Sequence, residues 1–134
     1  MLHPRRINAA EPLNRFLFNK QEFGTQPRRV THHAFMPNRN RTTGRLEKSV
    51  HRINGLSSSE IWRLGRLFVE QGRALKARAS GQSTQAMQAG LRFAIGGSPW
   101  PRHADIVEWP MEKSEQKLLA MQIAVAFVLE EASR

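Results

Sequence analysis

The chain has 134 residues, of which 40% are hydrophobic and 24% charged, a composition typical of one ordinary globular domain. It contains no cysteine, which excludes disulfides, thiolate catalysis and cysteine-based zinc sites. The formal net charge is +10 and is uneven: residues 1–55 hold 11 Lys/Arg and 3 Asp/Glu, whereas residues 56–134 hold 10 and 8. Such an excess predicts an anionic partner, most often nucleic acid, although charge that serves only solubility is the alternative.

Nothing near the start of the chain resembles a secretory signal. The most apolar stretch, residues 118–129, is interrupted by Gln122 and is too short to cross a bilayer. We therefore expect a cytoplasmic protein with no membrane partner. Residues 1–11 contain two adjacent arginines and no periodic pattern, which predicts a basic N-terminal arm ahead of a single domain over residues 12–134.

Residues 12–23 allow two interpretations. Pro12 suits the first position of a helix, but the spacing of Phe16 and Phe18 suits a short strand equally well. Residues 28–53 predict a β-hairpin, since apolar and polar residues alternate over 30–36 and again over 46–53. Pro37 should end the first of these strands, because proline cannot donate a ladder hydrogen bond.

The first long helix is predicted from Ser58 to Ala79. Ser57 and Glu60 form a capping box ahead of it, in which each side chain accepts from the other residue's backbone N–H. A short helix is predicted over residues 83–89, where Gly90 supplies the left-handed cap.

Short alternating segments predict further strands over 91–95 and 104–109, and Pro110 precedes a last helix over 112–132. The order strand, strand, helix, short helix, strand, strand, helix indicates an α+β fold. We expect a mostly antiparallel sheet of about four strands with two long helices packed on one face. The last helix is apolar over an unusually wide arc, so its excess either packs under the first helix or forms an interface with a protein partner or a second copy.

The basic hairpin is the main candidate for binding. Arginine forms bidentate contacts with phosphate, and a protruding basic ribbon can follow a phosphate backbone. The alternative is a solvated loop whose charges discourage edge pairing. The predicted nucleic-acid-binding residues are Arg28, Arg29, Arg39, Arg41, Arg45, Lys48 and Arg52.

The histidines are the candidates for proton transfer. Pairing Met36 with Leu46 in the hairpin would put His33 and His51 on one face of the sheet. If both strand pairs joined one sheet, His103 could converge with them. Ordinary surface or packing roles are the alternative, and we expect neither a metal site nor a cofactor.

His103 and Asp105 share a strand face, with Arg102 adjacent. A small nuclease would use His103 as acid or base, Asp105 to orient it, and Arg102 to stabilise phosphate charge. Trp100 would stack on a base if it were exposed, or close the core if it were buried. No glycine-rich phosphate loop, nucleophile elbow or metalloprotease pattern is present.

These patterns favour a small, non-enzymatic module that contacts a nucleic-acid backbone, alone or inside a larger assembly. Two alternatives stay open: the nuclease just outlined, and a protein-interaction component of a bacterial defence or toxin system.

Overall fold

The computed structural model describes residues 6–95 and 102–132. A seven-stranded antiparallel sheet has the order β7-β8-β5-β1-β6-β9, with β4 paired to β5, and β2 and β3 form a separate two-stranded sheet. The strands are β1 (Pro12–Leu17), β2 (Phe23–Thr25), β3 (Arg28–Val30), β4 (Asn38–Arg39), β5 (Leu46–Arg52), β6 (Ala77–Gln82), β7 (Arg92–Ile95), β8 (His103–Val107) and β9 (Val128–Glu131). The helices are α1 (Ser58–Glu70), α2 (Thr84–Gln88) and α3 (Lys113–Val125), with 3-10 turns η1 (Lys20–Glu22) and η2 (His32–Ala34).

The α+β class and the antiparallel sheet agree with expectation, but the expected number of strands is wrong. Residues 12–17 form the strand alternative, β1, which pairs with β6 over six residue pairs. Two more strands, β6 and β9, include residues that were predicted to belong to the two long helices. Alanine-rich residues 77–80 favour a helix locally, so the pairing with β1 and β9 outweighs their intrinsic propensity.

Both long helices are consequently shorter than predicted. The first ends at Glu70, and Gly72 then adopts φ +88°, a left-handed conformation that turns the chain toward β6. The last ends at Val125 and is followed by β9. The start of α1 is as predicted: Glu60 N–H donates to Ser57 Oγ at 3.2 Å, and Ser57 N–H donates to the Glu60 carboxylate at 3.0 Å.

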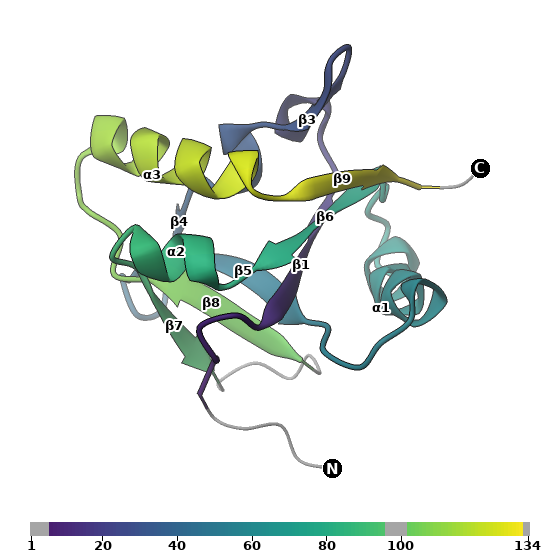
Figure 1. Cartoon of the computed structure of the whole chain (residues 1–134), viewed down its shortest axis with the longest axis horizontal. Coiled ribbons are helices and arrows are strands. Elements are labelled where there is room, and N and C mark those ends of the chain that lie inside the picture. Colours follow the sequence, from purple (N-terminus) through teal and green to yellow (C-terminus); the bar gives the residue numbers. More distant parts are fainter. Residues whose placement is uncertain (1–5, 96–101, 133–134) are drawn as a thin grey trace.

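The helices cover opposite faces of the sheet, which corrects the expectation that they share one face (Figure 1). Leu13 and Leu17 of β1 belong to the large core beneath α2 and α3. Phe16 of the same strand belongs to a second cluster beneath α1. Because side chains alternate along a strand, apolar residues on both faces of β1 require a helix on each side.

The predicted hairpin is only half correct. Its second strand exists as β5, but residues 32–34 of the first form η2, and the short strand β4 pairs with β5 instead. Asn38 therefore lies opposite Glu47 in place of the predicted pairing of Met36 with Leu46. Ala34 and Phe35 are adjacent and both fully buried, an arrangement that a turn allows and an alternating strand does not.

Ile7 and Glu11, which precede the sheet, are both buried. Within the described ranges, no helix has the length and apolar character needed to span a membrane.

Candidate functional site

Two of the predicted phosphate-binding cations are buried. Arg52 of β5 is 3% exposed and forms an ion pair with Glu11, donating from Nη2 to Glu11 Oε1 at 2.7 Å and from Nε to Glu11 Oε2. Lys48 is 6% exposed. Burial, followed by the charge of Arg15, lowers the pKa of Lys48 to about 7. Neither side chain lies where it could reach a nucleic-acid backbone.

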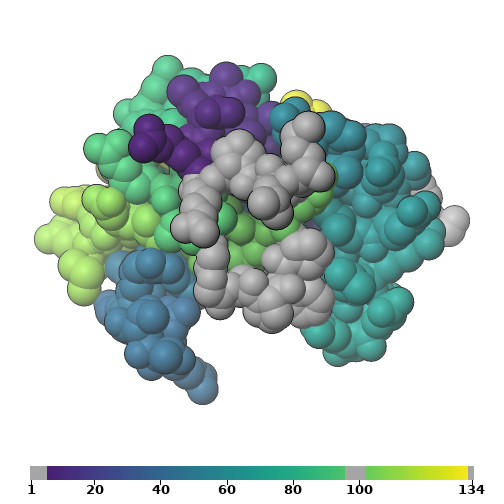
Figure 2. All heavy atoms as spheres, turned by 90° about the horizontal axis from the view of Figure 1, so that it is seen from below, coloured from purple at the N-terminus to yellow at the C-terminus, as the bar shows by residue number. Residues whose placement is uncertain are grey.

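The cations of the connection between β4 and β5 remain at the surface, and this segment projects from the body of the molecule (Figure 2). Arg45 pairs with Glu47 at 2.8 Å, so its charge is matched locally. Arg39 Nη1 donates to the Gly44 carbonyl at 2.6 Å and stiffens the loop. Arg41 is exposed. Only Arg39 and Arg41 of this segment therefore present charge without a carboxylate partner among the described residues.

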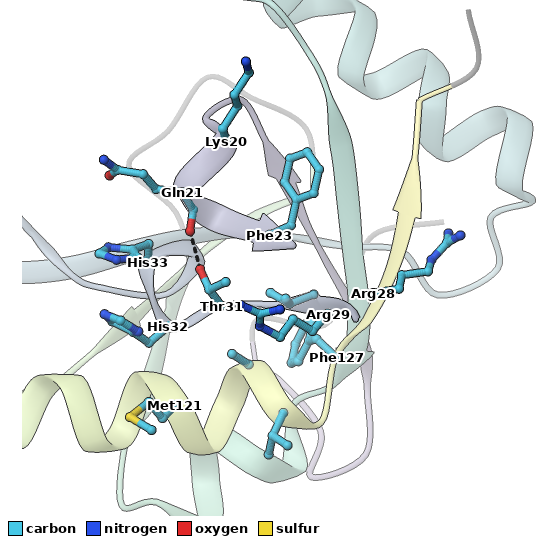
Figure 3. A pocket seen from close by; sticks show the side chains of 13 residues that line it. Lys20, Gln21, Phe23, Arg28, Arg29, Thr31, His32, His33, Met121 and Phe127 are labelled. Atoms are coloured by element: carbon cyan, nitrogen blue, oxygen red, sulfur yellow. Dashed lines mark hydrogen bonds between the residues drawn. The ribbon is translucent and has the colours of Figure 1, made fainter. Parts of the chain in front are cut away.

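The remaining two predicted cations, Arg28 and Arg29, line a groove of about 670 Å³ between the β2–β3 hairpin and α3 (Figure 3). Lys20 of η1 also lines this groove, at a distance from the two arginines (Figure 3). Arg28 lies beside β9 and donates to the Leu129 carbonyl at 2.9 Å, whereas Arg29 donates to the carbonyl of Pro27, two residues before it, at 3.2 Å. No carboxylate lines the groove among the described residues, so its potential is positive.

The floor of this groove is apolar. Phe23 and Val30 of the hairpin face Phe127, which is 7% exposed, and Met121 and Val125 of α3. Met121 is 48% and Val125 84% exposed, so this part of the floor is open to solvent. Met121 and Val125 of the wide apolar arc of α3 therefore border the groove and do not pack under α1, whereas Ile123 of the same helix is buried in the large core.

His33 belongs to this groove and does not join the other candidate histidines. The rings of His32 and His33 lie side by side above Met121, with centroids 4.0 Å apart (Figure 3). Burial, and then the neighbouring His33 and Lys117, lower the pKa of His32. Both rings offer flat faces at one end of the groove.

His51 and His103 do come together. They lie opposite each other in the ladder between β5 and β8, with ring centroids 6.0 Å apart and near-perpendicular planes. His103 Nε2 is 3.0 Å from the Asp105 carboxylate, which also accepts from Ser49 Oγ at 3.3 Å. Asp105 therefore orients His103 as expected from their shared strand face.

Arg102 does not complete that arrangement. Its Nη1 donates to the carbonyls of Arg52 and Asn54, at 3.3 and 3.2 Å, which ties the start of β8 to the end of β5. In the described part of the chain, no three His, Asp or Glu side chains are grouped as metal ligands would be. Trp100 lies outside the described residues.

Burial lowers the pKa of His51 to about 4, and the charges of His103 and Arg15 add to this effect. His51 packs against the rings of Phe16 and Phe68, at 5.4 and 5.8 Å. The imidazole is therefore neutral at pH 7, a state that suits either a packing residue or a proton acceptor.

Several residues of these sites were missed by sequence reasoning. In the groove they are Lys20 and Phe23, whereas Met121 and Val125 belong to the apolar arc of the last helix, for which an interface was one of the two predictions. Beside His51 they are Arg15 and Arg73. The Gly and Pro within residues 24–27 are a turn signal between two short segments, and they could have revealed the β2–β3 hairpin. No local pattern marks Arg15 or Arg73, because their neighbours come from distant segments.

Comparison with protein-family models, with curated proteins and with solved structures found no match for this chain.

Proposed function

We propose that this protein is a non-enzymatic module that binds single-stranded nucleic acid in the groove between the β2–β3 hairpin and α3. The observation that carries the proposal is that three cations, Lys20, Arg28 and Arg29, line the groove together with apolar and aromatic side chains, with no carboxylate among the described lining residues. Proteins that hold single strands combine a positive groove for the backbone with flat side chains for the bases.

Each class of lining residue has a role in this proposal. Lys20, Arg28 and Arg29 contact phosphates, and the rings of Phe23 and His32 stack on bases, a contact worth roughly 1–3 kcal/mol per base. A single strand is favoured over a duplex because a paired duplex keeps its base faces stacked inside and would leave the apolar floor uncovered.

The test is fluorescence anisotropy with labelled single-stranded RNA and DNA over a range of salt concentrations. The variant is Lys20→Gln/Arg29→Gln, since both residues are exposed and neither makes a hydrogen bond to another strand or helix within the described residues. Losing two phosphate contacts should reduce the slope of log K against log salt by about 1.4, because each contact contributes about 0.7 for a single strand.

The matched control is Arg39→Gln/Arg41→Gln in the connection between β4 and β5, which removes the same charge outside the groove. The groove proposal requires this control to keep most of the wild-type slope. Equal losses in the two variants would mean that binding follows net charge, and the groove would then have no special role.

A protein partner is the second candidate, and the exposed apolar residues beside the groove favour it. Leu118 is 63% and Val128 69% exposed, and they extend the apolar surface formed by Met121 and Val125. An acidic partner with an apolar centre would fit this surface. If the surface joins two copies of the chain, Leu118→Gln, which lies outside the groove lining and changes no charge, should shift sedimentation toward the monomer and leave the salt slope of oligonucleotide binding unchanged.

A further inference from the structure

Strands β1 and β5 part from each other near the centre of the sheet. Their ladder contains two pairs, Leu13 with Arg52 and Asn14 with His51, and ends there. The guanidinium of Arg15 enters the opening, donating from Nη1 to the Ser49 carbonyl and from Nε to the Ala34 carbonyl, both at 3.2 Å. A cationic side chain thus replaces the strand-to-strand hydrogen bonds at this point.

A cavity of about 130 Å³ lies beside Arg15, beneath α1. Two arginines and two histidines surround it, together with the Ser49 hydroxyl and three phenyl rings. The described lining residues are Arg15, Phe16, Phe18, Ser49, His51, Phe68, Arg73 and His103. No carboxylate is among them.

The cations at this cavity are poorly matched by acidic groups. The Glu22 carboxylate is 3.8 Å from Arg15, longer than a hydrogen bond. Arg73 stacks its guanidinium 3.7 Å above the Phe18 ring and makes no ion pair with another described residue. Asp105 is the other nearby carboxylate, and its oxygens are engaged by His103, Ser49 and Arg45.

The pKa shifts of the groups around the cavity agree with this shortage of acidic partners. The pKa values of Arg15, Lys48 and His51 are all lowered, to about 10, 7 and 4. Burial is the main cause in each case. Neighbouring positive charges lower each value further, whereas the Glu22 carboxylate raises the pKa values of Arg15 and Lys48. The positive charges that contribute to these shifts would favour a bound anion.

We propose that this cavity is a binding site for a phosphate-type tetrahedral oxyanion, held by the guanidinium groups of Arg15 and Arg73. Its volume is below the roughly 300–1,000 Å³ of pockets that enclose whole small molecules. It suits a free phosphate ion, or the terminal phosphoryl group of a ligand whose remainder stays outside. Arginine suits this role because its donors match the geometry of phosphate oxygens.

The proposal is independent of nucleic-acid binding in the groove. The first test is isothermal titration of the full chain with inorganic phosphate at pH 7, in a buffer of matched ionic strength. We expect saturable binding by the wild type. Arg73→Gln should weaken that binding by about tenfold or more, or 1.4 kcal/mol. The matched control is Arg63→Gln, which removes an exposed arginine of α1 outside the cavity and should leave phosphate affinity unchanged.

A second readout separates binding at the cavity from general attraction to a basic protein. Phosphate should raise the pKa of His51, followed by NMR of its ring proton. An absence of saturable binding, an equal loss in Arg63→Gln and Arg73→Gln, or an unchanged His51 titration would each overturn the proposal.

The source of the oxyanion is resolved by comparing three probes: inorganic phosphate, a 5′-phosphorylated dinucleotide and the same dinucleotide without the phosphate. Equal affinities for the first two identify the free ion. Tighter binding of the phosphorylated dinucleotide, with none by the unphosphorylated one, identifies a terminal phosphoryl group. Lys20→Gln/Arg29→Gln should leave phosphate binding at the cavity intact. A result that contradicts the groove proposal can therefore be distinguished from one that contradicts the cavity proposal.

Discussion

Gly65 of α1 rests against Phe16 of β1. A Cβ atom added to Gly65 would lie 2.9 Å from Phe16 Cε1 and 2.7 Å from Leu75 Cδ2. Phe16 is 2% exposed, so its ring has little space into which it could move to make room for a methyl group. The absence of a side chain at Gly65 therefore sets how closely α1 approaches the sheet.

Gly65→Ala should destabilise the protein even though alanine favours a helix. The gain in helix propensity is about 1 kcal/mol, and forcing a methyl group into a filled site costs about 1–3 kcal/mol. We expect a net loss of about 1 kcal/mol in the free energy of unfolding, measured by urea titration. Arg66→Ala, at an exposed position of the same helix, should change it by less than about 0.5 kcal/mol. A Gly65→Ala variant as stable as the wild type would show that α1 is not held this closely.

Arg52→Met should be strongly destabilising, because it removes the buried ion pair between Arg52 and the Glu11 carboxylate. Removing one member of a buried pair costs about 3–5 kcal/mol. The double variant Arg52→Met/Glu11→Leu should recover much of that loss, since no unpaired charge then remains. Thermal and urea unfolding of both variants and of Glu11→Leu provide the measurements for a double-mutant cycle. Strictly additive losses would mean that the two side chains do not act as a pair.

Stability should fall as the pH drops from about 6.5 to about 4, and His51 should be a main cause. Its pKa is 6.5 in a model peptide and about 4 in the folded protein. Between these values the unfolded chain binds a proton that the folded chain does not, so the contribution of His51 is complete above pH 6.5 and is lost as the pH decreases. The loss at pH 4 is about 3 kcal/mol.

This pH dependence can be measured by urea unfolding at pH 7 and pH 5. His51→Gln should have a smaller difference between the two pH values than the wild type. His33→Gln, at an exposed position, should retain the wild-type difference. If His51→Gln retained it as well, another group would have to be responsible.

Some features of this molecule follow from neighbours along the chain. The capping box of Ser57 and Glu60 starts α1, and Gly90 at φ +86° follows α2. The alternation over 46–52 produces β5. It also places His51 on the face of the sheet where it lies opposite His103 of β8. These predictions succeeded because a cap, a turn and an alternating strand each depend on residues only a few positions apart.

Other features depend on contacts that no local pattern contains. Residues 77–80 become a strand because β1 and β9 pair with them on both sides. The cations of the N-terminal half look alike in the sequence, yet Arg52 is buried against Glu11 while Arg29 stands on a groove wall.

Composition and short-range patterns predicted the basic excess, the α+β class, the first residues of the helices, and the strands β5 and β8. Long-range contacts established where the helices end, which face each one covers, which arginines reach solvent, and where β1 and β5 part around Arg15. The physical reason is that strand pairing and the burial of charge join segments tens of residues apart. The free energy of these long-range contacts outweighs the local conformational preferences on which a prediction from sequence depends.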